Sequence, residues 1–539
     1  MPESQVANAL AKLLKRLLEL AAKKAKGVWP TGFLTVFPRV FAEGTAAKSH
    51  ETFSADVGDY TPSLEPVSSV AIDAHDLKRT PKNAPWKYLL ERQRQPGPIH
   101  VEARGKCLVI IAGHHALVCH FSLEGNIRGM ARSDYEEMVA VSVPGNNPNK
   151  AKAQRLRSFV MPDRFVEAGA RKKNKLYKVN ILAAIVMEKH AFIVTDFSRM
   201  TQLHVVSSAV LLQWNDLRRG TGLGDRLWRR FRGGPDWVIE LDEALRVLDN
   251  WRASVLEEED DTAILDALLD VEGPGGGLGQ HLANDLLYGL AMHPDTPSFE
   301  VCASHEAFHE LRDYLPKFMA TWRSEEYYTR CAGLPNSNNP FVFHEVSNQN
   351  FLKSYVQVYR RTKVCIPAAL YDRYQSRGLF DPTHVIGTPY YGTWTPTSNQ
   401  FKRVEVRLFE HPQNNRYHVI RAIPPPSWNA KTDPSPFKDV SNAGFATTLG
   451  PASFYESMQN KLDIKQVQAT CAGRPGRPPK ISTGRPGRRP NPLTSRSVNR
   501  IQKSSYVRQK AVKTIEKENF PEDLVTVRYS TRSQGKGVV

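Results

Sequence analysis

The stretch Arg474–Pro490 constrains the fold of this chain most, because it has almost no apolar side chains with which to pack a core. A short unit of Arg, Pro and Gly occurs twice in it, and the second copy begins eleven residues after the first. Proline restricts φ and has no N–H to donate, so such a stretch favours an extended backbone. We therefore predict a disordered basic tail over residues 472–539. A proline-rich linker at 424–452 and a short helix at 453–471 are predicted to join this tail to a folded body.

Most of the net charge lies in this tail. The chain has 73 Lys and Arg against 55 Asp and Glu, a net charge of +18. From Arg474 to the end there are sixteen Lys and Arg and only four Asp and Glu, so this part contributes twelve of the eighteen charges. A strongly basic chain favours anionic partners such as nucleic acid, an anionic membrane surface or acidic protein. The body is only mildly basic, so the charge argument concerns the tail.

The residues before the tail have the composition of a folded protein. The length of 539 residues exceeds what one ordinary core supports, and 41% of the residues are hydrophobic. Strand-like and helix-like patterns are mixed, so we predict an α+β fold class with antiparallel hairpins and helices, divided into two units. The predicted parts are a basic amphipathic helix at 1–27, an α+β domain at 28–272 and a second α+β unit at 280–423. The glycine run at 273–277 is typical of a linker.

Apolar runs separated by short turn-like segments predict three strand hairpins. They lie at 107–121, 179–196 and 404–423. Leucines at helical spacing predict a helix at 6–26, which either docks on the fold or lies on a membrane surface. Residues 205–219 are predicted to form a helix that Gly220 ends.

The sequence argues against a membrane protein and against a disulfide-stabilised one. No segment approaches the roughly 18 consecutive apolar residues of a membrane-spanning helix. The six cysteines include no C-x-x-C pair and have irregular spacing, which is typical of reduced thiols in a cytosolic or nuclear protein. They are Cys107, Cys119, Cys302, Cys331, Cys365 and Cys471.

The run Gly476-Arg477-Pro478-Pro479-Lys480 resembles the C-terminal half of the AT-hook, a small DNA-binding motif of chromatin and transcription proteins. A second, degenerate copy follows at Arg485–Pro490. In each copy a proline separates the first arginine from the glycine. The resemblance implies a nuclear protein that binds A·T-rich DNA without a cofactor. The implied DNA-binding residues are Arg474, Gly476, Arg477, Pro478, Lys480, Arg485, Gly487, Arg488 and Arg489.

Physical chemistry supports that reading of the tail. The minor groove of A·T-rich DNA is narrow and strongly negative, and it attracts inserted arginines. Eleven residues of extended chain span about 34 Å, close to one turn of B-DNA. The two copies could therefore meet successive faces of the minor groove. The alternatives are a tail that binds RNA or another polyanion, a tail that contacts chromatin proteins, and a nuclear-import signal.

A second pattern, His305-Glu306-Ala307-Phe308-His309, has the H-E-x-x-H spacing of zinc peptidases. On a helix, His305 and His309 share a face and could bind one Zn²⁺, while Glu306 activates a bound water. Candidate third ligands are Glu325, Glu326 and His344. The simpler reading is a solvent-facing helix with surface His and Glu residues. A zinc hydrolase is thus the main alternative to a DNA-binding protein, and a non-enzymatic interaction protein with a polyanion-binding tail is the third.

Three weaker patterns also involve residues that can bind nucleic acid, metal or nucleotide. The basic and aromatic cluster at 218–232 could form a nucleic-acid surface, or Trp228 could anchor it to the core. One predicted hairpin contains four possible metal ligands, but they alternate between its two faces and so do not suit one metal ion. They are His114, His115, Cys119 and His120. The glycines at 273–279 follow no predicted strand, which argues against a dinucleotide-binding loop.

Overall fold

The computed structural model describes residues 3–37, 53–65, 86–90, 94–122, 125–145, 149–166, 177–218, 220–229, 233–270 and 273–332, and shorter pieces at 339–341, 347, 350–351, 354–359, 363–365, 368–379, 403–410, 416–420 and 438–439. The chain divides into two units between Arg474 and Pro475, and only the first contains described residues. The first unit combines helices with largely antiparallel sheets, which confirms the predicted α+β class.

A nine-stranded sheet forms the larger part of the β structure, with the strand order β2-β12-β5-β4-β3-β1-β10-β11-β6. All its pairs are antiparallel except β2 with β12. The strands are β1 Thr31–Val36, β2 Phe53–Asp56, β3 Gly97–Arg104, β4 Cys107–Ala112, β5 His115–His120, β6 Gly125–Ala131, β10 Ile181–Met187, β11 His190–Asp196 and β12 Gln202–Ser207. A smaller sheet contains β7 Ser142–Pro144, β8 Arg157–Val160 and β9 Lys178–Val179, and another contains β13 Lys363–Cys365, β14 Arg403–Glu410, β15 Arg416–Ile420 and β16 Lys438–Asp439.

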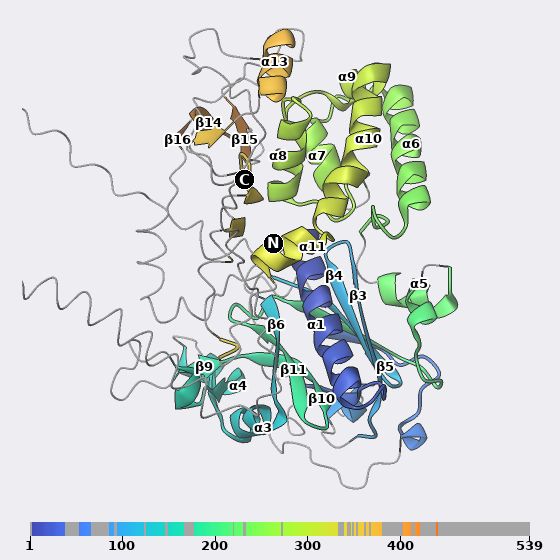
Figure 1. Cartoon of the computed structure of the whole chain (residues 1–539). Helices are drawn as coiled ribbons and strands as arrows, with labels where there is room; N and C mark the ends of the chain where they lie inside the picture. Colours follow the sequence, from blue (N-terminus) through green and yellow to red (C-terminus); the bar gives the residue numbers. More distant parts are fainter. Residues whose placement is uncertain are drawn as a thin grey trace, which may run out of the picture. The chain divides into compact units, whose positions relative to one another are not determined.

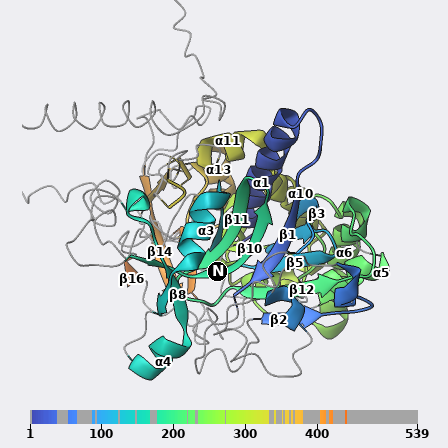
Figure 2. The same cartoon turned by 90° about the horizontal axis from the view of Figure 1, so that it is seen from below.

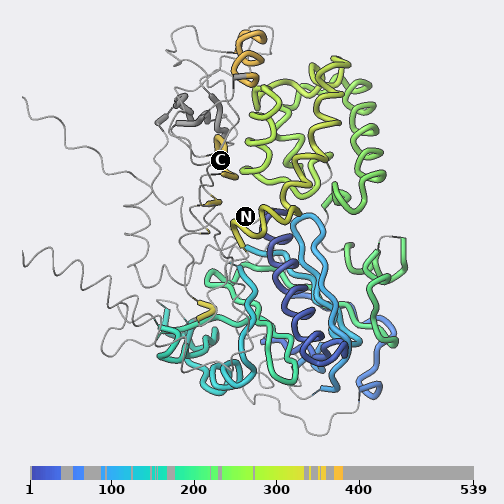
Figure 3. Tube along the Cα trace, viewed as in Figure 1, coloured from blue at the N-terminus to red at the C-terminus, as the bar shows by residue number. Residues whose placement is uncertain are grey.

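Helices cover the sheet and form a separate group of their own. The helices are α1 Ser4–Lys24, α3 Arg132–Ala140, α4 Lys150–Arg155, α5 Gly222–Arg229, α6 Leu241–Glu258, α7 Ile264–Leu269, α8 Gln280–Gly289, α9 Ser298–Ala303, α10 His305–Thr321, α11 Glu325–Cys331 and α13 Ala368–Ser376, with short 3₁₀ turns η2 Pro62–Leu64, η3 Lys87–Leu90, η4 Asp163–Phe165 and η5 Trp214–Leu217. Helices α6 to α10 pack on one another and form the helical group, as the yellow-green part of the trace shows (Figure 3). Helix α3 lies beside β11 (Figure 2).

Strand β4 is apolar throughout because both of its faces are buried. Leu108 and Ile110 face the main core, which also contains side chains of α1 and of the helical group. Val109 and Ile111 belong to a second cluster that is covered by α5 and by the segment that contains Leu212. Successive side chains of a strand point to opposite faces, so a strand covered on both sides needs an unbroken apolar run.

Helix α1 docks on the sheet, where it contacts β3, β4 and β6 (Figure 1). Leu10, Leu14 and Leu18 recur at helical spacing and are buried. The exposed face carries the lysines of the last turn. The helix predicted at 6–26 is therefore confirmed, and it is the docked form. None of the helices that the structure describes has the length and apolarity needed to span a membrane.

The hairpins predicted at 107–121 and 179–196 are confirmed as β4–β5 and β10–β11, and β14–β15 forms the third. The helix predicted at 205–219 is wrong. The segment begins inside β12, where Val205 pairs with Leu117 of β5, and only η5 follows. Pairing with β5 and burial on both faces of the strand outweigh a helical spacing that the sequence also allows.

Candidate functional site

The first candidate site lies where the start of α1 meets the start of α8. Glu3, directly before α1, is buried, and its carboxylate accepts hydrogen bonds from two backbone amides of α8. Oε1 accepts the N–H of His281 at 2.9 Å, and Oε2 accepts that of Leu282 at 2.8 Å. The first N–H groups of a helix have no partner inside it, and the helix dipole favours an anion there. Glu3 therefore caps α8 from a distant part of the chain.

Three glycines allow the backbone segments of this site to approach one another. Gly279 is the N-cap of α8, and a Cβ there would lie 2.5 Å from Glu3 Oε1. Gly277 has φ +86°, and its carbonyl accepts the N–H of Ser4 at 3.2 Å. A Cβ at Gly277 would also lie 3.3 Å from the Cα of Gly105. Gly277, the last glycine of the run that suggested a linker, thus lies where the Ser4 backbone and the β3–β4 turn meet.

Lys106 adds an amine to the turn that meets Gly277. It follows Gly105, which has φ +52°, in the turn between β3 and β4, and its side chain is partly buried. Burial lowers the pKa of Lys106, and the negative charge of Glu3 offsets only part of that effect. A lysine with a lowered pKa holds more of the neutral amine, which is the form that attacks electrophiles. The Glu3–Lys106 site therefore combines a lysine of lowered pKa with a buried carboxylate.

The H-E-x-x-H residues occupy the start of α10. Ser304 caps this helix by accepting a backbone N–H at 3.2 Å. His305, Glu306 and His309 are exposed, and the centroids of the two imidazole rings lie 4.1 Å apart, so the rings share a face as predicted. Within the described part of the chain, no group of three His, Cys, Asp or Glu residues could hold a metal ion. The zinc site stays a prediction.

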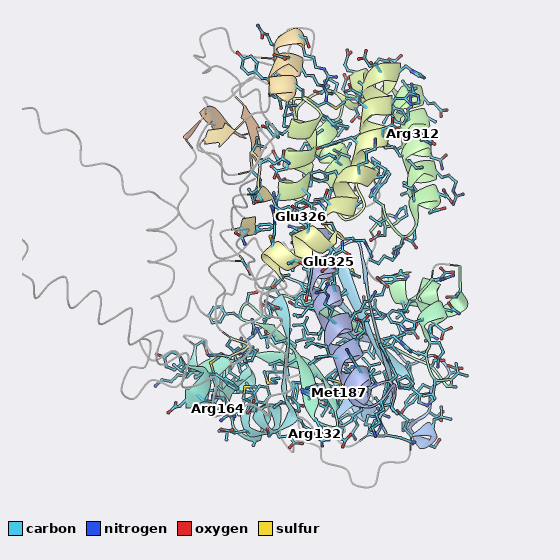
Figure 4. The ribbon with its side chains drawn as sticks, viewed as in Figure 1. Arg132, Arg164, Met187, Arg312, Glu325 and Glu326 are labelled. Atoms are coloured by element: carbon cyan, nitrogen blue, oxygen red, sulfur yellow. The ribbon has the colours of Figure 1, made fainter. Side chains whose placement is uncertain are left out.

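The proposed third zinc ligands have other partners or cannot be placed. Glu325, on α11, forms an ion pair with Lys12 at 2.8 Å and another with Arg16, both on α1. Hydrogen bonds from Lys12 and then Arg16 lower the pKa of Glu325 to about 2. Figure 4 shows Glu325 where α11 lies beside α1. Glu326 pairs within its own helix, and His344 lies outside the described residues.

The described part of the basic and aromatic cluster at 218–232 is tied to the fold. Trp228 is buried, and its indole N–H donates to a backbone carbonyl at 3.1 Å. The guanidinium of Arg104 lies over its ring, 4.8 Å from the centroid. Arg226 forms an ion pair with Asp56 at 2.8 Å. Trp228 therefore anchors α5 to the core and has no free face on which a base could stack.

His115 belongs to a buried polar network. Its Nε2 lies 2.9 Å from a carboxylate oxygen of Glu65, and its Nδ1 lies 2.9 Å from the hydroxyl of Ser207. Arg94 also pairs with Glu65 at 2.7 Å, and the hydroxyl of Tyr88 bonds to Ser207 at 2.5 Å. All five side chains are buried. A hydroxyl, an imidazole and a carboxylate can form a hydrolytic triad, but a substrate cannot reach Ser207 here. The network joins β5 and β12 to the segments on either side.

The nine predicted DNA-binding residues between Arg474 and Arg489 lie outside the described residues, so their role stays a prediction. Sequence reasoning missed Glu3 and Lys106. A Gly-Lys pair between two apolar runs, an acidic residue before an amphipathic helix and glycines before a second helix are all visible in the sequence. Nothing in these patterns indicates that the three segments meet, because they are far apart along the chain.

Neither a family model nor a curated protein matches this sequence. Similar solved structures include wild-type Fpg (MutM) of Lactococcus lactis, a formamidopyrimidine DNA glycosylase, in complex with DNA that contains an oxidized pyrimidine. It is 12% identical, with 78% of this chain and 98% of that chain covered and a TM-score of 0.36. MutM with DNA that contains carbocyclic 8-oxo-G has 12% identity, the same coverage and a TM-score of 0.35. A mutant of the Lactococcus lactis protein with Fapy-dG containing DNA has 13% identity, the same coverage and a TM-score of 0.37. At these TM-scores the similarity assigns neither a fold family nor a function to this chain.

Proposed function

We propose that this protein binds DNA and that its folded part is a DNA glycosylase or lyase that acts on damaged or abasic nucleotides. The similar structures named above are DNA glycosylases solved with DNA. The proposal for this chain rests on its own residues. The observation that carries it is the position of Lys106, a partly buried amine with a lowered pKa, in the turn that meets Gly277, whose carbonyl binds the residue after the buried Glu3.

An amine that acts on DNA has a particular target. Intact DNA offers no aldehyde or ketone, but a nucleotide that has lost its base has an aldehyde at C1′. The neutral Nζ of Lys106 adds to C1′, the former carbonyl oxygen takes one proton from that nitrogen and a second from solvent and leaves as water, and a protonated C=N bond forms. The resulting cation acidifies the C2′ hydrogen. Loss of that proton expels the 3′ phosphate and breaks the strand.

Glu3 suits this reaction because its negative charge lies near the developing cation. Its two hydrogen bonds to α8 fix the orientation of the carboxylate, so it need not reorganise as charge forms. In the free protein, burial lowers the pKa of Lys106 and the charge of this carboxylate raises it in part. Glu3 is therefore placed to stabilise the positive charge on nitrogen during the attack.

The tail would supply affinity for DNA. It contributes twelve of the eighteen net charges, and each lysine or arginine that contacts a phosphate releases a condensed counterion. We propose that Arg474, Arg477, Arg485 and Arg488 insert into the minor groove of A·T-rich DNA or contact its phosphates. We also propose that this tail keeps the protein in the nucleus, close to its substrate. The same cations could bind RNA or chromatin proteins.

A strand-cleavage assay tests the enzymatic part. The full chain is incubated with an end-labelled duplex that contains one abasic site. We expect cleavage at that site, and we expect Lys106→Ala to slow it on the order of 10²-fold or more. Lys317→Ala, which removes an exposed lysine of α10, is the matched control and should cleave at the normal rate. An intact strand with the wild-type chain would contradict the enzymatic proposal.

A binding titration tests the tail separately. The full chain and a chain that ends at Thr470 are titrated with A·T-rich and G·C-rich duplexes at one salt concentration. We expect the truncation to remove most of the affinity and the full chain to prefer the A·T-rich duplex. Equal affinity for both duplexes would leave counterion release as the source of binding and would end the minor-groove proposal.

A further inference from the structure

We infer that Asp236 and Arg323 are positioning residues that hold Lys106 in place at the candidate site. The inference rests on the proposed function of the Glu3–Lys106 site. It concerns two residues whose side chains bind the backbone of the turn that carries Lys106.

Asp236 binds the turn directly. It lies in the segment before α6 and is buried. Its Oδ2 accepts the backbone N–H of Gly105 at 3.0 Å. The same oxygen accepts a hydrogen bond from Nη2 of Arg323 at 2.9 Å. One carboxylate oxygen thus links the residue before Lys106 to a cation of the helical group.

Arg323 binds the same turn at Ala103. It lies between α10 and α11, and its Nη2 also donates to the backbone carbonyl of Ala103 at 2.8 Å. Its Nη1 lies 3.5 Å from Oε1 of Glu102. Asp236 and Arg323 together therefore hold the backbone at Ala103 and at Gly105, which leaves Lys106 little freedom to move with respect to the helical group.

Asp236 is itself rigidly held. Its Oδ1 accepts the N–H groups of Val238 at 2.9 Å and Ile239 at 3.2 Å. Its own N–H donates to Oε2 of Glu240 at 2.9 Å, and that oxygen also accepts Nε of Arg104 at 2.8 Å. Burial alone would raise the pKa of Asp236, but the charge of Arg323 and these backbone N–H groups outweigh it and lower the pKa. The carboxylate is therefore ionised, and both of its oxygens accept hydrogen bonds.

The arrangement couples the two halves of the candidate site. Glu3 is fixed to the helical group through the N-terminus of α8, and Lys106 is fixed to the same group through Asp236 and Arg323. The separation of amine and carboxylate then depends on both attachments. A misplacement of about 1 Å in such a site can reduce a rate on the order of 10²-fold, so the attachments have a role beyond stability.

The test measures the reactivity of Lys106 in the free protein and its rate on DNA. Competitive labelling with acetic anhydride over a range of pH, read by mass spectrometry of the Lys106 peptide, gives the pKa of that amine. Strand cleavage of the abasic duplex under single-turnover conditions gives the rate and the apparent affinity separately. The variants are Asp236→Asn and Arg323→Gln. Each breaks the Asp236–Arg323 ion pair, and because Arg323 is the more exposed partner, Arg323→Gln serves if Asp236→Asn does not fold.

A matched control exists on the same helices. Asp249 of α6 pairs with Arg312 of α10 at 3.1 Å in an exposed ion pair that does not touch the turn. Asp249→Asn removes an ion pair of the same two residue types and should leave both readouts unchanged.

We expect either test variant to raise the pKa of Lys106 toward its ordinary value, because a released turn exposes the amine to water. We also expect the single-turnover rate to fall on the order of tenfold or more, with a smaller change in affinity. A Lys106 pKa that does not move in folded variants would overturn the positioning role. If that pKa moves but the wild-type chain cleaves no abasic DNA, the positioning role stands and the proposed function fails.

Discussion

Glu3 offers a prediction whose size follows from the structure. Its carboxylate accepts two backbone N–H bonds at the buried N-terminus of α8. A hydrogen bond to a charged group contributes about 1.5–3 kcal/mol to stability. Glu3→Ala removes both bonds and leaves two buried amides without a partner, so we expect it to lower the free energy of unfolding by about 3–5 kcal/mol. Glu3→Gln keeps one acceptor oxygen and loses the charge, so we expect about 2–3 kcal/mol.

Urea unfolding followed by tryptophan fluorescence and by circular dichroism measures these changes. Both probes are needed because a chain of this size can unfold in more than one step. Glu306→Gln, in the first turn of α10, is the control, and because Glu306 is exposed we expect a change within about 0.5 kcal/mol. If Glu3→Ala and Glu3→Gln also fall within about 0.5 kcal/mol, the cap on α8 is not formed as described, and the geometry of the site must be revised.

Three further changes test the packing around Glu3, the state of the Lys106 amine and the zinc hypothesis. Gly279→Ala would place a Cβ 2.5 Å from Glu3 Oε1, so we expect the free energy of unfolding in the same urea assay to fall by about 1–3 kcal/mol. The control is Gly222→Ala, which should be tolerated because nothing lies within 4 Å of the added carbon. Because the pKa of Lys106 is lowered, its neutral form accumulates at a lower pH than that of a free lysine. The rate of abasic-strand cleavage should therefore rise with pH and level off below about pH 10.4, the ordinary pKa of lysine. A rate that still rises at that pH would contradict this prediction. Glu306→Gln should leave abasic-strand cleavage unchanged and the purified chain should lack stoichiometric zinc; loss of cleavage in this variant, or one bound zinc, would favour the hydrolase interpretation.

Much of the fold could be predicted from local patterns. The β4–β5 hairpin was readable because an apolar run of six residues, a Gly113 turn and a second apolar run define both strands and their register. Helix α1 was readable because its leucines recur at helical spacing. The helix predicted at 205–219 was wrong because it rested on apolar spacing alone. The β-branched Val205 and Val206 favour a strand, and they pair with β5.

The candidate site could not be predicted in the same way. Glu3, Lys106 and Gly279 become neighbours only through tertiary packing, and each looks ordinary within its own segment. Two residues that stood out locally have structural roles instead. Trp228 in its cluster of arginines packs into the core, and His115 in its run of histidines is held by Glu65 and Ser207. A local motif indicates residue chemistry, whereas burial and partners decide whether that chemistry is accessible to a substrate.

Borohydride trapping on abasic DNA tests the role of Lys106 most directly, because the reagent reduces the C=N bond and joins protein and DNA permanently. We predict a covalent adduct with the wild-type chain, located at Lys106 by mass spectrometry of the linked peptide and lost in Lys106→Ala. The absence of an adduct would contradict amine chemistry at this site. An adduct of undiminished yield in Lys106→Ala would show that another amine performs the reaction.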